Sequence, residues 1–331
     1  MAHGANPIEI DRILCPVDFS EFSSPALERA LRLGHWFDAR VEVLHVIPLP
    51  VPVGAGLPFF PAPLEVSEGQ REQAARRLTN LVAPYLGEGV PMETRVLQGD
   101  PGRMIQEEAE ALPADLLVMG THGRSGFEHL LLGSVTEKVL RRAPCPVLTV
   151  GPVAAHPRVG PLFSRILAAA DLTQASEHTL DVALSLATEN DAQITLLHVV
   201  ETLPGTHLPM AVPELGPLHR DLVAQSRTDL RNAVPEAARS FCEVTERVET
   251  GTPWSEILRV ASQMDADLIV MGAHTGGTLE RMFFGSTACQ VVRRATCPVL
   301  VIHETRPTAP TASDVVETAR SRSAGHLSRA L

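Results

Sequence analysis

Short runs of hydrophobic residues alternate with segments of helical periodicity along most of the chain. The runs are rich in Val, Ile and Leu, as is typical of strands buried on both faces of a parallel sheet. The first half has predicted strands at 11–20, 41–47, 92–100, 114–120 and 145–150, and predicted helices at 25–37, 67–86, 101–112 and 135–143. This β-α-β-α-β-α-β-α-β order predicts an α/β fold with a parallel sheet and helices on both faces.

Local signals mark the starts of two of these helices. Ser24 stands before Pro25, and Asp100 before Pro101, in the order expected of an N-cap followed by the first helical residue. By contrast, segment 48–65 is too rich in proline for regular structure, and we expect a long loop or lid there.

The second half of the chain repeats the first. Segment 163–173 matches the first strand, 194–200 matches the second, and 266–302 matches 114–150 almost residue for residue. Each match lies about 150 residues after its counterpart, which indicates a duplicated domain.

The length of 331 residues suits two domains, each large enough to bury its own core. We predict domains at 1–152 and 161–304, joined by a short linker rich in proline and glycine. The polar segment 305–331 is expected to be a mobile C-terminal tail.

Composition and charge narrow the possible functions. The net charge of −11 argues against a nucleic-acid-binding protein, and the chain has no run of about 18 apolar residues to span a membrane. Because the N-terminus also lacks the pattern of a secretory signal, we expect a cytoplasmic protein. The five cysteines form no CxxC pair, so we expect reduced thiols and no structural metal.

A glycine-rich stretch, Gly120 to Ser134, connects a predicted buried strand to a predicted helix. Its glycines allow positive φ angles and close approach of the backbone to a ligand, and Ser134 stands where a helix N-cap is expected. Two interpretations are open from the residues alone. The stretch is either a phosphate cradle or an ordinary turn between strand and helix.

Asp18 ends the predicted first strand and Asp171 ends its counterpart in the repeat. If the strand order is 3-2-1-4-5, the ends of strands one and four straddle the crevice in which such sheets bind ligands. Asp18 then lies beside Gly120 and is placed to accept hydrogen bonds from ribose hydroxyls. The alternative role is a turn or helix cap bonded to a nearby N–H.

These segments resemble the universal stress protein family over nearly the whole chain apart from the tail. Gly120, Gly123, Gly133 and Ser134 have the spacing G-x2-G-x9-G-[S/T], the ATP-binding signature of that family. The resemblance implies two tandem Rossmann-like domains of the adenine nucleotide alpha hydrolase-like kind. Each is expected to contain a five-stranded parallel sheet of order 3-2-1-4-5 with helices on both faces.

The resemblance also implies an ATP site in the first domain. Adenine and ribose are expected at the ends of strands one and two, and the triphosphate along the glycine loop. Carried over to this chain, the expected residues are Pro16, Val17, Asp18, Val46, Met119, Gly120, His122, Gly123, Gly133, Ser134, Val135 and Thr136. Mg²⁺ or Mn²⁺ would accompany the triphosphate through phosphate oxygens and water.

The second domain departs from the signature. Thr275 replaces the second glycine, and a β-branched residue resists positive φ; Ala169 replaces Pro16. Gly276 and Gly277 offer a shifted turn that would restore a cradle. We expect this domain to bind ATP weakly or not at all, and a weak second site would consist of Asp171, Val199, Gly272, Gly285 and Ser286.

The motifs describe a binding module better than an enzyme. The glycine loop lacks the lysine of a Walker motif, and the chain has no nucleophile elbow. His122 and His274 are the only candidate bases in the two loops, and local packing is the simpler role for both. We therefore expect a nucleotide-dependent regulatory protein. The alternatives are a slow ATPase or a nucleotidyl or phosphoryl transferase, and a ligand-free protein-interaction module.

The duplication also suggests how the two domains associate. Because the family commonly pairs through its last strand, the segments 145–150 and 297–302 are expected to contact each other in an intramolecular pseudo-dimer. Further homodimerisation and the identity of a protein partner stay open.

Overall fold

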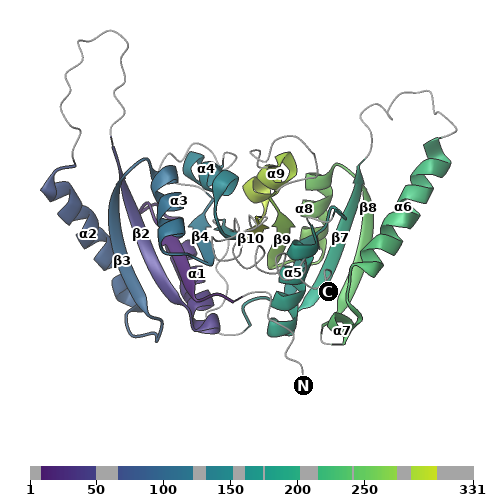
Figure 1. Ribbon diagram of the computed structural model, residues 1–331, viewed down its shortest axis with the longest axis horizontal. Helices are drawn as coiled ribbons and strands as arrows, with labels where there is room; N and C mark the ends of the chain where they lie inside the picture. Colours follow the sequence, from purple (N-terminus) through teal and green to yellow (C-terminus); the bar gives the residue numbers. More distant parts are fainter. Residues whose placement is uncertain are drawn as a thin grey trace, which may run out of the picture.

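Two copies of one β/α arrangement stand side by side in the structure (Figure 1). The computed structural model describes residues 9–49, 66–121, 132–151, 161–173, 176–201, 215–240, 242–273 and 285–303. The predicted tail, most of the predicted lid and linker, and the middles of both glycine loops lie outside the described residues.

The first half contains the predicted elements in the predicted order. They are β1 (Arg12–Pro16), α1 (Ser23–Phe37), β2 (Arg40–Pro48), α2 (Glu68–Val82), the 3-10 turn η1 (Ala83–Tyr85), β3 (Met92–Gly99), α3 (Pro101–Ala111), β4 (Leu116–Gly120), α4 (Ser134–Arg142) and β5 (Val147–Val150).

The second half has the same order with one short additional helix. Its elements are β6 (Arg165–Ala169), α5 (Ser176–Asn190), β7 (Gln193–Glu201), α6 (Leu215–Asn232), α7 (Glu236–Arg239), β8 (Val244–Gly251), α8 (Pro253–Gln263), β9 (Leu268–Gly272), α9 (Ser286–Arg294) and β10 (Val299–Ile302).

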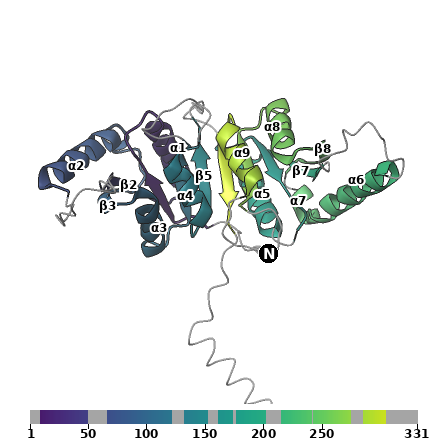
Figure 2. The ribbon, with the colours of Figure 1, turned by 90° about the horizontal axis from the view of Figure 1, so that it is seen from above.

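The ten strands within the described residues form one sheet with the order β3-β2-β1-β4-β5-β10-β9-β6-β7-β8. Within each half the described strands are parallel in the order 3-2-1-4-5, which confirms the predicted topology of a Rossmann-like domain. The halves join where β5 pairs antiparallel with β10, with Leu148 opposite Leu300, so the predicted contact between the last strands is also confirmed. At this junction the arrows of β5 and β10 point in opposite directions (Figure 2).

The helices cover both faces of the sheet, as predicted. One hydrophobic core lies beneath α1, α2, α5 and α6, and the other beneath α3, α4, α8 and α9. Both cores continue across the β5–β10 junction, because each contains buried residues from both halves of the chain. Aliphatic side chains such as Ile13, Leu117, Ile166 and Leu300 dominate them, in agreement with an aromatic fraction of only 4% in the sequence.

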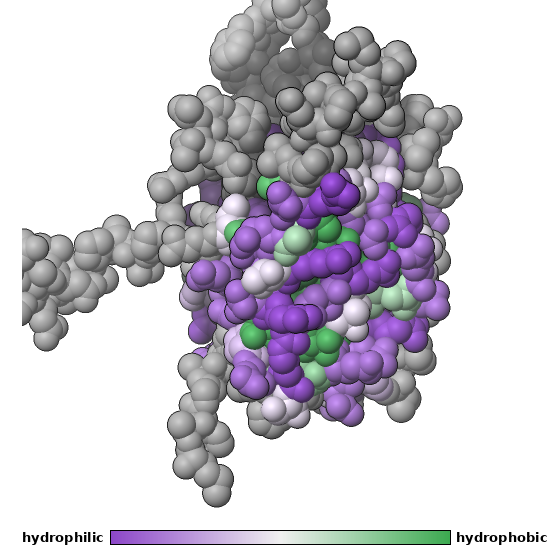
Figure 3. Space-filling model, turned by 90° about the vertical axis from the view of Figure 1, so that its right-hand side faces the viewer, coloured by the Kyte–Doolittle hydropathy of each residue, from purple (hydrophilic) through white to green (hydrophobic). Residues whose placement is uncertain are grey.

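The outer ends of the sheet are protected by charge. The end that carries α6 and β8 is mainly hydrophilic, with isolated hydrophobic side chains (Figure 3). On the edge strand β8, Glu246 pairs with Arg239 at 2.5 Å and Arg247 pairs with Glu249 at 2.7 Å. Charged side chains on an edge strand oppose further pairing with other chains. None of the described helices is long and apolar enough to cross a bilayer.

The predicted helix starts had mixed outcomes. Asp100 is the N-cap of α3, and its Oδ1 accepts a hydrogen bond from the Arg103 N–H at 3.0 Å, as expected. The predicted N-cap at Ser24 is wrong, because α1 already begins at Ser23 and the N-cap position is Phe22. The Ser23 hydroxyl instead donates to Asp18 Oδ1 at 3.0 Å, and this contact joins the helix start to the end of β1.

Candidate functional site

A cavity of about 280 Å³ lies where the carboxyl ends of β1, β2 and β4 meet the first turn of α4. Ten of the twelve residues that were predicted to bind ATP line it, namely Pro16, Val17, Asp18, Val46, Met119, Gly120, Gly133, Ser134, Val135 and Thr136. The other two, His122 and Gly123, lie outside the described residues. Residues far apart in the sequence therefore meet at the crevice where the topology places a ligand.

Asp18 is held at the cavity wall by a turn. Its Oδ1 accepts hydrogen bonds from the Ser20 N–H at 2.9 Å, the Ser20 hydroxyl at 2.6 Å and the Ser23 hydroxyl at 3.0 Å. Phe19 takes a φ of 62°, which bends the chain sharply after the strand. One carboxylate oxygen thus has the structural role that was considered for this residue, and the turn fixes the carboxylate beside the cavity.

His45 forms part of the cavity floor, although the sequence analysis did not include it. The ring is buried, and Nδ1 lies 2.7 Å from the carbonyl oxygen of Val17. Because a carbonyl oxygen only accepts, Nδ1 carries the proton in this contact. The Phe19 ring lies 4.2 Å from the imidazole, centroid to centroid, and helps to hold it. His45 thereby fixes the end of β1 against β2.

The N-terminus of α4 opens into the cavity. Gly133, not Ser134, is the N-cap, so the expectation for Ser134 was wrong by one position. The Gly133 N–H donates to the carbonyl oxygen of Thr121 at 2.9 Å, which closes the base of the glycine loop. Within the described residues no side chain caps this helix. The backbone N–H groups of its first turn lack intrahelical partners and together form a site suited to an anion.

A buried hydroxyl fixes α4 to the strand before it. Thr136 Oγ1 donates to the carbonyl oxygen of Gly120 at 2.9 Å, and Thr136 is 4% exposed. This bond connects the first turn of the helix to the end of β4, on the two sides of the glycine loop. The N–H groups at the helix start are therefore positioned relative to the strand ends before any ligand arrives.

The start of α3 completes this side of the cavity. Gly99 has a φ of 150°, a conformation that favours glycine, and it turns the chain from β3 into α3 so that Pro101 lines the cavity. Asp100 Oδ2 accepts from Lys138 Nζ of α4 at 2.9 Å. Lys138 and the Arg103 N–H hold the pKa of Asp100 below its ordinary value. This ion pair joins α3 to α4 across the cavity rim.

Eight further lining residues were missed by the sequence analysis. They are Ser20, Phe22, Ser23, Leu44, His45, Pro48, Pro101 and Ile105. Most of them lie next to a strand end or at a helix start. Ligands in such sheets bind outside the carboxyl ends of the strands, so a search of every loop that follows a strand would have found these residues.

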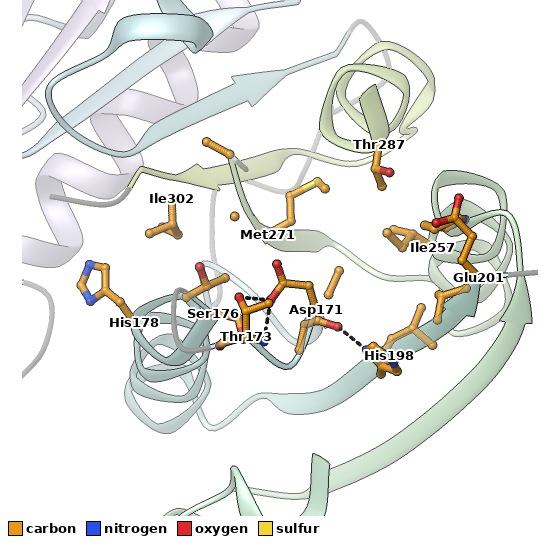
Figure 4. A pocket seen from close by; sticks show the side chains of 18 of the residues that line it. Asp171, Thr173, Ser176, His178, His198, Glu201, Ile257, Met271, Thr287 and Ile302 are labelled. Carbon is orange, nitrogen blue, oxygen red and sulfur yellow. Dashed lines mark hydrogen bonds between the residues drawn. The ribbon is translucent and has the colours of Figure 1, made fainter. Parts of the chain in front are cut away.

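The second half contains a related cavity of about 320 Å³ (Figure 4). Asp171, Val199 and Gly272 of the predicted weak site line it, whereas Gly285 and Ser286 do not. The turn at the strand end is retained, since Asp171 Oδ1 accepts from the Thr173 N–H at 2.9 Å and from its hydroxyl at 2.7 Å. The histidine contact is retained as well, with His198 Nδ1 2.9 Å from the carbonyl oxygen of Ala170.

Two differences make the second cavity a poorer anion site. Glu201 lines it at the position that Pro48 occupies in the first half, and its carboxylate repels phosphate. Ala288 stands in place of Thr136, so the hydroxyl that fixes α4 to β4 has no counterpart in α9. From α9 only Thr287 lines the cavity. The sequence analysis had found the altered glycine but neither of these changes.

The residues that line the first cavity are suited to binding a ligand. Helix N–H groups can bind an anion, Asp18 and the serines can hydrogen-bond hydroxyls, and Val46, Met119 and Ile105 offer apolar contact. Burial raises the pKa of the Cys15 thiol to about 12, so this residue beneath the site is not a nucleophile at neutral pH. Among the described residues no group of three or more His, Cys, Asp or Glu side chains is placed to hold a metal ion.

Two known proteins are similar to this chain in sequence. A universal stress protein of Methanocaldococcus jannaschii is 37% identical over 144 residues, which is 42% of this chain and 81% of that protein. A universal stress protein of Mycolicibacterium smegmatis is 29% identical over 297 residues, or 88% of this chain and 96% of that protein. The second relative therefore matches both halves in tandem.

A solved structure shows the same fold. A functionally unknown protein of Pseudomonas aeruginosa PAO1 superposes with a TM-score of 0.65 at 21% sequence identity, covering 91% of this chain and 95% of its own. The family model described as Universal stress protein family matches residues 9–151 and again residues 162–303. These two matches cover most of the chain, and the chain belongs to the universal stress protein family.

Proposed function

We propose that the first half of the chain binds ATP in the cavity between β1, β4 and α4, and that the protein acts as a nucleotide-dependent regulatory module in the stress response. Adenine and ribose would lie against Val46, Met119 and Asp18, and the phosphates against the first turn of α4. A Mg²⁺ or Mn²⁺ ion would be held by phosphate oxygens and water.

One observation carries this proposal. Ten of the predicted site residues, taken from four separate elements and their loops, line a single cavity into which an uncapped helix N-terminus opens. A helix start without a side-chain cap has N–H donors that an anion can use, and the dipole of α4 adds to the attraction. The apolar residues in the cavity lining suit a nucleobase.

The second half is proposed to bind ATP weakly or not at all. Three features weaken anion binding in the second cavity. They are the carboxylate of Glu201, the absence of a hydroxyl equivalent to that of Thr136, and the smaller share of the lining that α9 provides. A change in nucleotide occupancy would then alter one half of the pseudo-dimer only. Regulation would follow if ATP changes what the surface near the glycine loop presents to a partner.

The test places a negative charge at matching positions in the two halves. Val135→Glu adds a carboxylate to the first turn of α4 at the cavity wall, and Thr287→Glu does the same in α9. An acidic residue in the first turn favours helix formation, so both variants are expected to fold. Isothermal titration should give about one ATP per chain for the parent, a loss of at least about tenfold in affinity for Val135→Glu, and no change for Thr287→Glu.

Other results would contradict the proposal. Two equal sites per chain would remove the asymmetry, and a loss confined to Thr287→Glu would place the nucleotide in the second half. Phosphate release from ATP should not exceed that of a His122→Ala variant. A rate far above that control would favour the ATPase alternative.

A further inference from the structure

A third cavity, of about 310 Å³, lies between the two halves of the chain. Its apolar lining includes Leu33, Leu116 and Leu148 from the first half, and Val182, Leu186 and Leu300 from the second. Three ionisable side chains, those of Glu9, Asp115 and His178, also line it. His178 and Ile302, side by side at one end of the cavity in Figure 4, border both this space and the cavity of the second half.

The duplication provides an internal comparison for this space. The pseudo-twofold axis through the β5–β10 junction relates α1 to α5, and Arg29 and Val182 are the seventh residues of these two helices. Arg29 is 4% exposed although it carries a guanidinium group. The long side chain is therefore buried at a place whose counterpart holds only the short Val182.

Arg29 lies against the counterparts of the residues that line the third cavity. Its Nη1 donates to the carbonyl oxygen of Leu162 at 3.3 Å, and its Cζ lies 5.5 Å from the centroid of the Phe163 ring. The carboxylate of Asp267 favours its charged form, the guanidinium of Arg32 opposes it, and the thiol of Cys297 lies nearby. In the first half the counterparts of these four second-half residues are Glu9, Ile10, Asp115 and Cys145, and each of them lines the cavity.

The carboxylate in the cavity matches the one beside Arg29. Asp115 Oδ2 accepts from the Asp11 and Arg12 N–H groups at 2.9 Å each, as Asp267 does from the Ser164 N–H at 2.8 Å and the Arg165 N–H at 3.0 Å. Among the described residues, Asp115 Oδ1 has no hydrogen-bond donor. The carboxylate thus retains an oxygen that a cation can approach.

We infer that the third cavity binds a small organic cation with a guanidinium or primary ammonium head on an apolar stem. On one side of the pseudo-twofold axis the chain supplies such a group itself, as Arg29. On the other side the short Val182 stands at the equivalent position, and the cavity there is lined by the carboxylates of Asp115 and Glu9 and by several leucines. This inference does not depend on the proposed nucleotide site.

The test uses the free equivalent of an arginine side chain, the n-propylguanidinium ion, with neutral n-propylurea as its isostere. Isothermal titration of the full chain should show one n-propylguanidinium per chain, and n-propylurea should bind at least about tenfold more weakly because it lacks the charge. Val182→Arg supplies the cation from the chain and should abolish binding. Arg29→Val opens the related space and should raise the stoichiometry to two.

Two controls separate loss of the site from loss of the fold. Val182→Leu should keep both the fold and the binding of n-propylguanidinium. Asp115→Asn removes the charge of the side chain but keeps an oxygen that can accept from the Asp11 and Arg12 N–H groups. The Asp115→Asn variant should bind n-propylguanidinium about tenfold more weakly and n-propylurea unchanged. Absence of saturable binding by the parent, or binding that survives Val182→Arg in a folded protein, would overturn the inference.

Discussion

Replacing Arg29 with methionine should stabilise the protein even though it removes a hydrogen bond. Burial lowers the pKa of Arg29 well below its ordinary value, to about 10, despite the opposing charge of Asp267. At about 1.36 kcal/mol per unit, holding the charged form costs roughly 3 kcal/mol. Within the described residues its Nη2 is buried without a hydrogen-bond partner, which agrees with a cost of this kind.

Two favourable contacts offset part of that cost. The long hydrogen bond to Leu162 contributes about 1 kcal/mol, and the Phe163 ring about 0.5–1 kcal/mol. Methionine has a similar length and no charge, so Arg29→Met should raise the free energy of unfolding by about 1–2 kcal/mol near neutral pH. Urea unfolding of parent and variant, followed by circular dichroism, measures the difference.

The pH dependence of this difference gives a second measurement. Because the folded pKa of Arg29 lies below its ordinary value, the cost of burying the charge is fully present below about pH 10 and decreases as the pH rises from there towards the ordinary pKa of arginine. The increase in the free energy of unfolding caused by Arg29→Met should therefore be equal at about pH 7 and about pH 9, and should decrease above pH 10. A loss of more than about 1 kcal/mol in Arg29→Met would refute this reasoning, provided that Val182→Met, the matched control for packing, is neutral or stabilising.

Two further substitutions test the contacts around the first cavity. Thr136→Val removes the hydrogen bond from the hydroxyl to the carbonyl oxygen of Gly120 and should lower the free energy of unfolding, measured in urea, by about 1 kcal/mol. Thr79→Val, at an exposed hydroxyl bonded to the carbonyl oxygen of Ala75, should change it by less than about 0.5 kcal/mol. Equal losses in the two variants would contradict a special role for Thr136. Asp100→Ala should cost about 1 kcal/mol at neutral pH, while Thr252→Ala, at a cap with no side-chain bond, should cost less. Because Lys138 and the Arg103 N–H lower the pKa of Asp100, the Asp100→Ala difference should be full above pH 3.8 and close as pH falls further.

The sheet could be predicted from local patterns because its strands are buried on both faces. Runs such as ADLLVMG (114–120) and its repeat at 266–272 mark buried strands, and the duplication made the second half predictable from the first. The cap at Asp100 could be predicted since it acts within one turn of its own helix. Ser24 was misassigned because the start of α1 is determined by the turn before it, in which the Ser23 hydroxyl donates to the carboxylate of Asp18.

The site was predicted as far as strand ends determine it. Pro16 to Asp18 and Met119 to Gly120 belong to neighbouring strands, so topology alone brings them together. The effect of Glu201 required knowledge of which wall its carboxylate faces. The third cavity was beyond prediction, because Arg29 and Leu162 are 133 residues apart and only the packing of two helices across the junction determines what fills the space.

The antiparallel β5–β10 pairing within one chain also changes how this protein responds to mutation. In a dimer of identical subunits every substitution is present in both copies. A change that improves one site therefore alters the other site as well, and it changes the interface at two symmetric positions. Here a single gene encodes both partners of the junction, and each substitution occurs once. Arg29 opposite Val182, Thr136 opposite Ala288 and Asp100 opposite Thr252 are differences that a symmetric dimer could not carry. Because both halves belong to one chain, the two sites on the shared sheet can change independently of each other.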